Sequence, residues 1–448
     1  MGIPYRNQED GVVKNPKENS IKEPDGQNGN RAGVVLPSGM NRREFIKTSA
    51  LGVLGAHLLL TGCDTPEEKS TAALEKIQIG GMHYRRLGRT GLMISEISLG
   101  GSPVPTESVF RKAVEMGVNY VDTSSFYSFG NSERSIAKII KGRRDTFYVG
   151  TKFHPGRNVT SFFRRKTKEA LIEEAEGSLK RLQTDYVDIL LVHGAADPAV
   201  LASSEVLGAF DQLKRDGKIR FTGVSCHKDP VRVLTPAINS GSYDMITVGY
   251  NAYSGTGFEK GKVYDDYLAG SGIAQVISLA REKDVGVVAM KSMAGGDRQN
   301  LAGLKTEGVS LPQAKLKWVL RNDAVSTVIS EMTTFEILEE NLSVTGKDLA
   351  AAEEQGLARY VRATGGDYCR MCGTCLRICP KGIAVPDIMR YVMYYERYGK
   401  TRYAVNSYHD LPPAATFLGC TRCGECETSC PYGLTIVLKL RRAHRMLA

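Results

Sequence analysis

Residues 97–127 read ISLGGSPVPTESVFRKAVEMGVNYVDTSSFY. The short apolar runs at 97–101 and 118–123 have the length and composition of buried strands. The longer amphipathic stretch between them has the length of a helix. This segment therefore predicts a strand, a helix and a second strand, which is the unit that builds parallel sheets.

The same alternation continues along the chain. Further strand-like apolar runs lie at 146–152, 186–193, 219–224, 245–250, 286–290 and 326–330. Eight such runs, separated by helical patterns, predict an α/β fold with a (β/α)8 TIM barrel over residues 82–345. A doubly wound open sheet alternates in the same way, but no Gly-x-Gly-x-x-Gly follows the first run, which disfavours that fold.

Composition and charge are those of a globular protein with one large domain and one small one. The chain has 448 residues, of which 42% are hydrophobic and 24% charged, and a formal net charge of +10. The basic residues are spread along the chain and lack the interleaved aromatic side chains of a nucleic-acid channel. We therefore expect a solvated basic surface and no nucleic-acid partner.

The amino-terminal segment has the features of an export signal. NRREFIK at 41–47 and the apolar run 48–62 resemble a twin-arginine signal, with Arg42 and Arg43 as the pair. Fifteen apolar residues are too few to span a bilayer as a stable helix. Residues 1–39 are polar, and they are either disordered or upstream of a true start at Met40.

The export signal ends in a candidate lipid-anchor site. LTGC at 60–63 resembles a bacterial lipobox, in which Cys63 would be acylated and attach the protein to a membrane. The alternative is that Cys63 is an incidental residue near a simple cleavage site. Residues 64–81 are polar and charged, as a tether is. The segment as a whole predicts a periplasmic protein or a membrane-anchored lipoprotein.

Four residue types suited to acid–base chemistry follow predicted strands. Asp122, Lys152 and His193 come at the ends of the second, third and fourth strands, and Tyr127 follows five residues after Asp122. Residues at the carboxyl ends of barrel strands converge on one site. Each residue alone has a structural explanation, such as a cap or a packed ring, but all four in this order favour a catalytic site.

The chain resembles the aldo-keto reductases over residues 84–345. The resemblance is carried by RLGRTGL at 86–92, NYVDT at 119–123, SLKRL at 178–182, DYVD at 185–188 and EEN at 339–341. It implies an enzyme that interconverts a carbonyl and an alcohol on a small substrate, with sugars among the candidates.

The resemblance also assigns roles to the four residues. Tyr127 would be the general acid and base, and the Lys152 ammonium would improve it by acting on a phenol pKa that is ordinarily near 10. Asp122 would hold Lys152 through a charge-assisted hydrogen bond, and His193 would orient the carbonyl.

The family resemblance implies a nicotinamide nucleotide, NAD(P), with contacts from Ser225, Ser330 and Asn341. The pattern departs from the family at three points. Cys226 stands where an asparagine is usual, and we expect it to be a buried thiol rather than a nucleophile. The stretch 289–296 lacks the tyrosine that commonly stacks on the nicotinamide. Glu331 is an acid where a cation would meet a 2′-phosphate, which argues against a preference for NADPH.

Two cysteine runs predict an iron-sulfur domain. Their spacing is identical, Cys-x2-Cys-x2-Cys-x3-Cys-Pro, and the runs consist of Cys369, Cys372, Cys375 and Cys379, then Cys420, Cys423, Cys426 and Cys430. In ferredoxins with this spacing, the fourth cysteine of each run binds the other cluster. We therefore expect one 4Fe-4S cluster on Cys369, Cys372, Cys375 and Cys430, and a second on Cys379, Cys420, Cys423 and Cys426. Zinc is the alternative, because repeated Cys-x2-Cys is also a zinc pattern.

The predicted iron-sulfur domain is α-rich, ferredoxin-like and small. It spans residues 366–448, and a helix over 346–365 connects it to the barrel. Residues 386–398 predict a tyrosine-rich helix that packs on the barrel or receives a partner, with packing favoured.

Three functions fit these features. In the first, the barrel converts its substrate and the clusters exchange electrons with a redox partner. In the second, the enzyme is a nicotinamide-dependent reductase with structural clusters. In the third, the chain is an electron-transfer module without catalysis, which the retention of all four catalytic residue types disfavours. A hydride carries two electrons and each cluster one, and no flavin signature bridges them.

Overall fold

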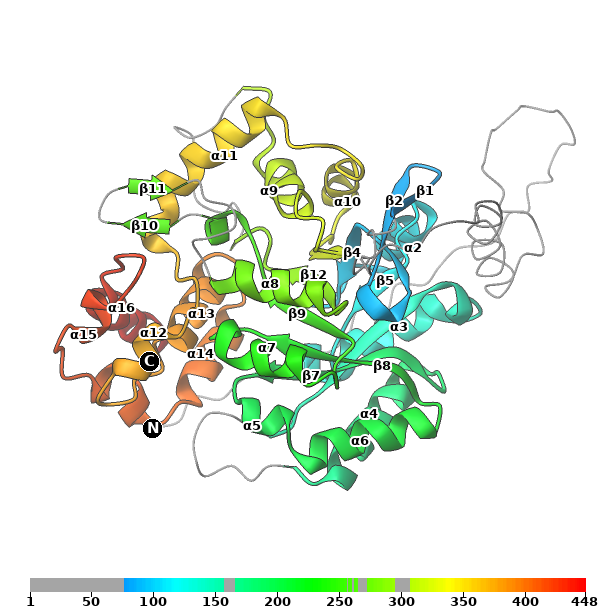
Figure 1. Ribbon diagram of the computed structural model, residues 1–448, viewed down its shortest axis with the longest axis horizontal. Helices are drawn as coiled ribbons and strands as arrows, with labels where there is room; N and C mark the ends of the chain where they lie inside the picture. Colours follow the sequence, from blue (N-terminus) through cyan, green and yellow to red (C-terminus); the bar gives the residue numbers. More distant parts are fainter. Residues whose placement is uncertain (1–75, 157–165, 256, 260–261, 265–271, 295–306) are drawn as a thin grey trace, which may run out of the picture. The chain divides into compact units, whose positions relative to one another are not determined.

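The fold is a closed barrel of eight parallel strands, described by a computed structural model. The structure describes residues 76–448 except 157–165, 256, 260–261, 265–271 and 295–306, and these residues belong to one compact unit. Helices surround the strands (Figure 1). The barrel strands, in chain order, are β4 (Ile97–Gly100), β5 (Tyr120–Asp122), β6 (Tyr148–Phe153), β7 (Val187–Ala195), β8 (Ile219–Cys226), β9 (Met245–Gly249), β12 (Gly286–Met290) and β13 (Thr327–Ser330).

All eight predicted strands are present, and the predicted TIM barrel is confirmed. Neighbours follow chain order around the barrel, and β13 closes it by pairing with β4, where Val328 is opposite Ile97. Strands such as β4 and β5 are buried along their whole length. Because a barrel strand is covered by helices outside and by side chains inside, it reads as an apolar run rather than as an alternating one.

The helices around the barrel pack their apolar faces on the strands. Several begin at a threonine or serine whose side chain accepts a hydrogen bond from the first turn, for example Thr167 before α4 and Ser203 before α6. They are α2 (Glu107–Glu115), α3 (Asn131–Ile140), α4 (Lys168–Leu182), α5 (Pro198–Leu201), α6 (Ser204–Arg215), α7 (Pro230–Asn239), α8 (Gly272–Glu282), α9 (Leu311–Leu320) and α10 (Phe335–Leu342). Short 3-10 helices lie at Gly88–Thr90, Tyr127–Gly130, Arg144–Thr146 and Ala252–Gly255, and a hairpin is formed by β10 (Gly257–Glu259) and β11 (Lys262–Tyr264).

A small antiparallel sheet precedes the barrel and was not predicted. It contains β1 (Lys76–Ile79), β2 (Met82–Arg86) and β3 (Met93–Ser95). The described chain thus has a strand at 76–79, inside the range 64–81 that the sequence suggested for a tether. Pairing with β2 supplies the hydrogen bonds that fix this four-residue segment, Lys-Ile-Gln-Ile, as a strand, with Ile79 opposite Met82.

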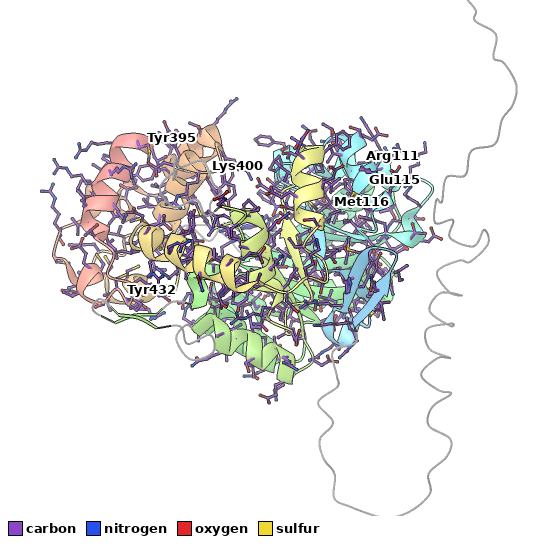
Figure 2. All side chains as sticks on the ribbon, turned by 90° about the horizontal axis from the view of Figure 1, so that it is seen from above. Arg111, Glu115, Met116, Tyr395, Lys400 and Tyr432 are labelled. Carbon is purple, nitrogen blue, oxygen red and sulfur yellow. The ribbon has the colours of Figure 1, made fainter. Side chains whose placement is uncertain are left out.

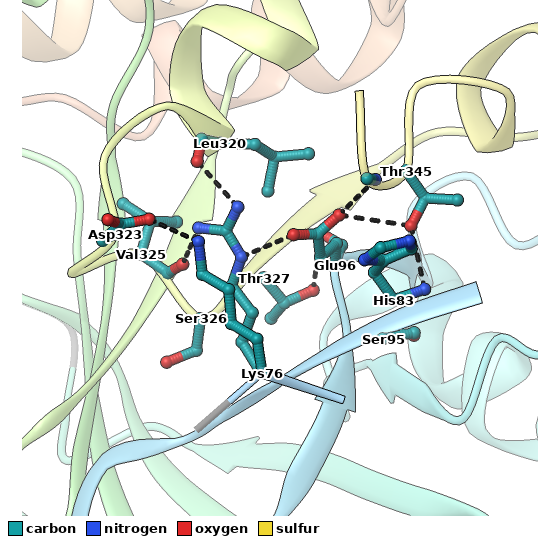
Figure 3. A network of polar contacts seen from close by, with 12 residues as sticks. Lys76, His83, Ser95, Glu96, Leu320, Asp323, Val325, Ser326, Thr327 and Thr345 are labelled. Atoms are coloured by element: carbon teal, nitrogen blue, oxygen red, sulfur yellow. Dashed lines mark hydrogen bonds and ion pairs between the residues drawn. The ribbon is translucent and has the colours of Figure 1, made fainter. Parts of the chain in front are cut away.

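A buried ion pair joins this sheet to the amino-terminal end of the barrel (Figure 3). Arg85 Nε lies 2.6 Å from Glu96 Oε1, and both side chains are about 5% exposed. The remaining Arg85 nitrogens donate to the carbonyl oxygens of Leu320 and Val325, which come just before β13. Glu96 Oε2 accepts from the Gly346 N–H at 2.9 Å. Every charge in this network has a partner, as burial requires.

The carboxyl-terminal region is helical and has its own apolar core. Its elements are α11 (Ala351–Thr364), α12 (Thr374–Ile378), α13 (Val385–Glu396), α14 (Thr401–His409), α15 (Glu425–Thr428) and α16 (Ile436–Leu447), with 3-10 turns at Gly365–Asp367, Pro413–Ala415 and Phe417–Gly419. The predicted connecting helix corresponds to α11 and the predicted tyrosine-rich helix to α13. Residues 366–448 are called the cluster domain below. The α-rich second domain is confirmed.

The predicted export signal, the lipobox with Cys63 and most of the tether lie outside the described residues. Within the part of the chain that the structure describes, none of the helices has the length and apolar character needed to cross a membrane.

Candidate functional site

The four predicted catalytic residues meet at the carboxyl end of the barrel. Asp122 is the last residue of β5, Lys152 lies near the end of β6 and His193 near the end of β7. Tyr127 begins the 3-10 helix that follows β5. The parallel register of β5, β6 and β7 places these strand ends side by side, so that residues up to 71 positions apart share one site.

Lys152 and Asp122 form a buried ion pair beneath the site. Lys152 Nζ contacts Asp122 Oδ1 directly and donates to the Thr123 carbonyl oxygen at 2.7 Å. Tyr120 donates to the other Asp122 oxygen at 3.4 Å. Burial raises the pKa of Asp122, and the Lys152 ammonium opposes this effect. The pair agrees with the predicted role of Asp122 as the group that holds Lys152.

Tyr127 lies over the ion pair and beside His193. The Lys152 Nζ is 5.0 Å from the centre of the Tyr127 ring. The His193 ring meets the Tyr127 ring edge-on, with centroids 5.7 Å apart. Burial raises the pKa of Tyr127 well above its usual range, and the Asp122 charge adds to this. The expected lowering by Lys152 does not prevail, because burial of the ring dominates and the Asp122 charge acts in the same direction. Tyr127 is therefore a neutral phenol, which is the form a general acid requires.

His193 is held in one orientation by Ser124, which the sequence analysis did not identify. Ser124 Oγ lies 3.0 Å from His193 Nδ1 and accepts a hydrogen bond from the Phe126 N–H at 3.2 Å. Burial and the Lys152 charge lower the pKa of His193 well below its usual range, so the ring is neutral. We assign the Ser124 hydroxyl hydrogen to Nδ1, which leaves the ring proton on Nε2. The signal in the sequence was weak: a serine two residues past the end of a strand.

Replacing Ser124 with alanine is expected to lower kcat for carbonyl reduction by up to about tenfold, because one hydrogen bond that sets the His193 tautomer is lost. The Ser124→Ala variant should also shift the acidic limb of the pH–rate profile, which a purely structural role would not move. Ser128→Ala, which changes an exposed serine in the 3-10 helix after Ser124, is the control. An unchanged kcat and profile in Ser124→Ala would contradict the positioning role.

The predicted nucleotide contacts fall into two places. Ser330 ends β13, and its Oγ accepts from Asn341 Nδ2 at 3.0 Å. Ser225 is buried near the end of β8 and pairs in register with Thr247 of β9. The structure thus brings Ser330 and Asn341 together, and Ser225 belongs to a different strand end.

Three buried polar atoms near these positions have no hydrogen-bond partner among the described residues. They are Asn341 Oδ1, Thr247 Oγ1 and Ser292 Oγ. Buried polar atoms are nearly always paired, so unpaired ones mark places where a polar ligand fits. A nicotinamide nucleotide, with its carboxamide and adenine donors, suits this set. Thr247 lies within β9 and Ser292 just after β12, and both were missed because a lone hydroxyl carries no motif.

Two departures from the family pattern have structural explanations. Cys226 is buried, its thiol donates to the Lys228 carbonyl oxygen, and burial raises its pKa to about 12, as expected for an inert thiol. Glu331 Oε1 lies 3.2 Å from Lys400 Nζ, which also donates to the Ser102 carbonyl oxygen. Lys400 is labelled in Figure 2. The sequence next to Glu331 contains no cation, and the structure supplies one, Lys400, from the turn between α13 and α14.

The eight cysteines of the two runs gather in two sets. Each set lines one cavity. The first cavity is lined by Cys369, Cys372, Cys375 and Cys430, and the second by Cys379, Cys420, Cys423 and Cys426. These are the two sets that the spacing predicted. Burial raises the pKa of Cys369 to about 12, so thiolates there require compensating positive charge. A metal cluster with four thiolate ligands fits both donor sets.

The cluster domain packs directly on the carboxyl end of the barrel. The Asp229 N–H, after β8, donates to the Met371 carbonyl oxygen at 2.9 Å, and Arg377 of α12 forms an ion pair with Asp229. Met393 of α13 belongs to the same apolar core as the barrel residues. The tyrosine-rich helix therefore packs on the barrel, as the sequence favoured.

Comparison with known proteins agrees with both parts of the chain. A model of the aldo/keto reductase family matches residues 98–303, and a model of the 4Fe-4S dicluster domain matches residues 368–435. L-galactose dehydrogenase of Arabidopsis thaliana is 29% identical over 302 residues, which cover 58% of this chain and 88% of that protein.

Two solved structures resemble the chain over part of its length. An aldo-keto reductase from Bacillus halodurans in its holo form is 24% identical and covers 62% of this chain and 95% of its own, with a TM-score of 0.50. An aldo/keto reductase from Klebsiella pneumoniae in complex with NADP and acetate is 23% identical and covers 61% and 94%, with a TM-score of 0.47.

The barrel, the residues at its carboxyl end and the family match define an oxidoreductase. The chain carries an aldo/keto reductase domain followed by a carboxyl-terminal 4Fe-4S dicluster domain, the combination that the sequence predicted. The zinc alternative for the cysteine runs is thereby set aside in favour of iron-sulfur clusters.

Proposed function

We propose that the enzyme interconverts a carbonyl and an alcohol on a small, sugar-like substrate, with Tyr127 as the general acid and base. The observation that carries the proposal is the neutral Tyr127 phenol, placed beside His193 and above the Lys152–Asp122 pair. The match to L-galactose dehydrogenase supports a sugar-like substrate.

The chain's own residues account for orientation and proton transfer. In the reducing direction, the His193 Nε2–H donates to the substrate carbonyl oxygen and fixes its position. The Tyr127 hydroxyl then gives its proton to the developing alkoxide. Lys152 stabilises the negative charge that remains on Tyr127, and Asp122 keeps the lysine in place. In the oxidising direction, the same proton returns to Tyr127.

A bound nicotinamide would supply or accept the hydride. Ser225, Thr247 and Ser292 would hold its carboxamide end, and Ser330 and Asn341 its adenosine end. The unpaired buried atoms of Asn341, Thr247 and Ser292 support this assignment. Neither NAD nor NADP is favoured, because Glu331 is an acid that Lys400 already neutralises.

The cluster domain would hold two 4Fe-4S clusters, one in each cysteine set, which exchange single electrons with a redox partner. The two cavities and their four-cysteine linings support the count. A purely structural role for the clusters is the alternative. The protein would be exported by the twin-arginine route and anchored through acylated Cys63. Because its clusters would be inserted before export, the protein would need a route that carries folded proteins.

Adding an alcohol substrate to the anaerobic, cluster-loaded protein is expected to produce the electron spin resonance signal of reduced clusters if electrons pass to the cluster domain. The signal should be absent in Tyr127→Phe, which cannot accept the substrate proton, and present in Tyr395→Phe on α13. Turnover with nicotinamide but without a cluster signal would leave the clusters with a structural role and contradict the redox proposal.

A further inference from the structure

The mouth of the barrel is built by both domains. His227 follows β8 and Lys291 follows β12, while Arg390 reaches the mouth from α13 of the cluster domain. All three side chains are half-buried. Lys291 Nζ lies 5.7 Å from the ring centre of Tyr394, which is also on α13. Residues from the two domains therefore face one shared space.

This shared edge has an excess of positive charge. Asp387 of α13 pairs with both Lys228 and Arg390, so one carboxylate serves two cations. Among the described residues, no carboxylate lies within ion-pair distance of Lys291. Three basic side chains therefore share one carboxylate, and an uncompensated charge at a half-buried place is costly.

Two buried nitrogen atoms at this edge also lack a partner. Arg390 Nε and His227 Nδ1 have no hydrogen-bond partner among the described residues. Lys291 has a left-handed backbone (φ 58°), and Asn251 holds it by donating to its carbonyl oxygen at 3.1 Å. Strained residues persist where surrounding contacts enforce them, often at ligand sites. Burial, and then the Arg390 charge, lower the pKa of Lys291 to about 7, an effect that a bound anion would reverse.

The cationic edge is within reach of the catalytic groups. The His227 ring centre lies 6.3 Å from that of His193, and His193 is in edge contact with Tyr127. A small molecule whose carbonyl lies between Tyr127 and His193 can therefore extend one end to Lys291 and Arg390. In the barrel order, β8 is separated by β9 and β12 from β13, which carries Ser330.

We propose that Arg390, Lys291 and His227 form a binding site for the carboxylate of the substrate, so that the cluster domain completes the active site and selects acidic substrates such as uronic acids. The inference rests on the proposed carbonyl and alcohol chemistry and names the class of its substrate. A carboxylate fits because it accepts charge-assisted hydrogen bonds from a guanidinium and an ammonium at once. Because His227 lies beside His193, on a strand end away from Ser330 and Asn341, the site favours the substrate over a cofactor phosphate.

The test measures binding to the full-length, cluster-loaded protein by anaerobic calorimetry. Two matched pairs of ligands are compared. D-glucuronate has a carboxylate that D-glucose lacks, and 4-carboxybenzaldehyde has a carboxylate where 4-carbamoylbenzaldehyde has a neutral amide. We expect the anion of each pair to bind more tightly than the neutral molecule. Arg390→Met and Lys291→Met should each weaken anion binding roughly 10- to 100-fold and leave the neutral molecules unaffected. Arg390→Lys should restore part of the affinity.

Matched controls separate this site from general charge and from misfolding. Arg441→Met on α16 and Lys180→Met on α4 remove exposed cations and should change nothing. Iron content and visible absorption show whether the cluster domain is intact in Arg390→Met. The inference is overturned if neither anion binds more tightly than its neutral partner. It is also overturned if Arg390→Met and Lys291→Met weaken inorganic pyrophosphate or NADP but not the carboxylates.

The Tyr127→Phe variant separates this inference from the proposed function. It should lose turnover and keep the preference for the carboxylate in binding. If Tyr127→Phe kept full turnover while the carboxylate preference held, the proposed chemistry would fail and the anion site would stand. If turnover depended on Tyr127 while both anions bound no better than their neutral partners, the anion site alone would fail.

Discussion

Replacing Tyr127 with phenylalanine is expected to lower kcat for carbonyl reduction by roughly 10²- to 10⁴-fold, because the alkoxide then has no positioned acid. The ring and its contacts with His193 and Lys152 would remain, so substrate binding should be nearly unchanged. Steady-state kinetics with a fixed nicotinamide concentration would measure both. Tyr395→Phe removes a phenol from α13 outside the site and should have kcat close to that of the unaltered enzyme.

The pH dependence of the same reaction provides a second check on Tyr127. Its pKa is raised by burial, and reduction requires the protonated phenol. The rate of reduction should therefore stay level from neutral pH past about pH 10, the ordinary tyrosine value, and fall only above it. Oxidation requires the phenolate and should rise over the same upper range. A reduction rate that falls near pH 7 would show that another group is the acid.

Replacing Glu96 with glutamine is expected to lower the free energy of unfolding by about 3–5 kcal/mol, the cost of leaving one partner of a buried ion pair uncompensated. The Arg85 guanidinium would remain at the amino end of the barrel without a counter-charge, and the Gly346 N–H would lose a charged acceptor (Figure 3). The urea midpoint, followed by circular dichroism, measures the change. Glu107→Gln breaks the exposed pair with Arg111 and should cost at most about 1 kcal/mol.

The Glu96 contribution should also depend on pH. Burial alone would raise its pKa, but Arg85 and the Gly346 N–H leave it below the ordinary value of 4.5. A carboxylate with a lowered pKa stabilises the fold above its unfolded pKa, and this contribution is lost as the pH falls through the lower folded value. Glu96→Gln should therefore lose less stability than the unaltered protein on acidification. Equal losses in both would contradict the assigned role of the ion pair.

Local pattern was enough to predict the barrel and the cysteine sets. A barrel strand buried on both sides must be apolar throughout, so β4 to β13 are visible as runs in the sequence. Four thiols around one cluster impose a fixed spacing, so the two linings of four cysteines followed from counting residues. Strand β1 was missed because it is a run of only four residues, Lys-Ile-Gln-Ile, and its partner, β2, supplies the order.

The four catalytic residues could be predicted from the sequence because each comes at or after the end of a strand, and parallel strands end on the same side of a barrel. The sequence by itself thus determined the fold, the meeting of Asp122, Tyr127, Lys152 and His193, and the sorting of the cysteines. Only the tertiary structure decided that Ser124 orients His193, that Asp122 offsets the charge of Lys152, and that α13 brings Arg390 to Lys291 and His227. The reason is physical: periodicity and spacing report contacts within one element or one motif, whereas hydrogen bonds and charges between domains depend on how two surfaces pack.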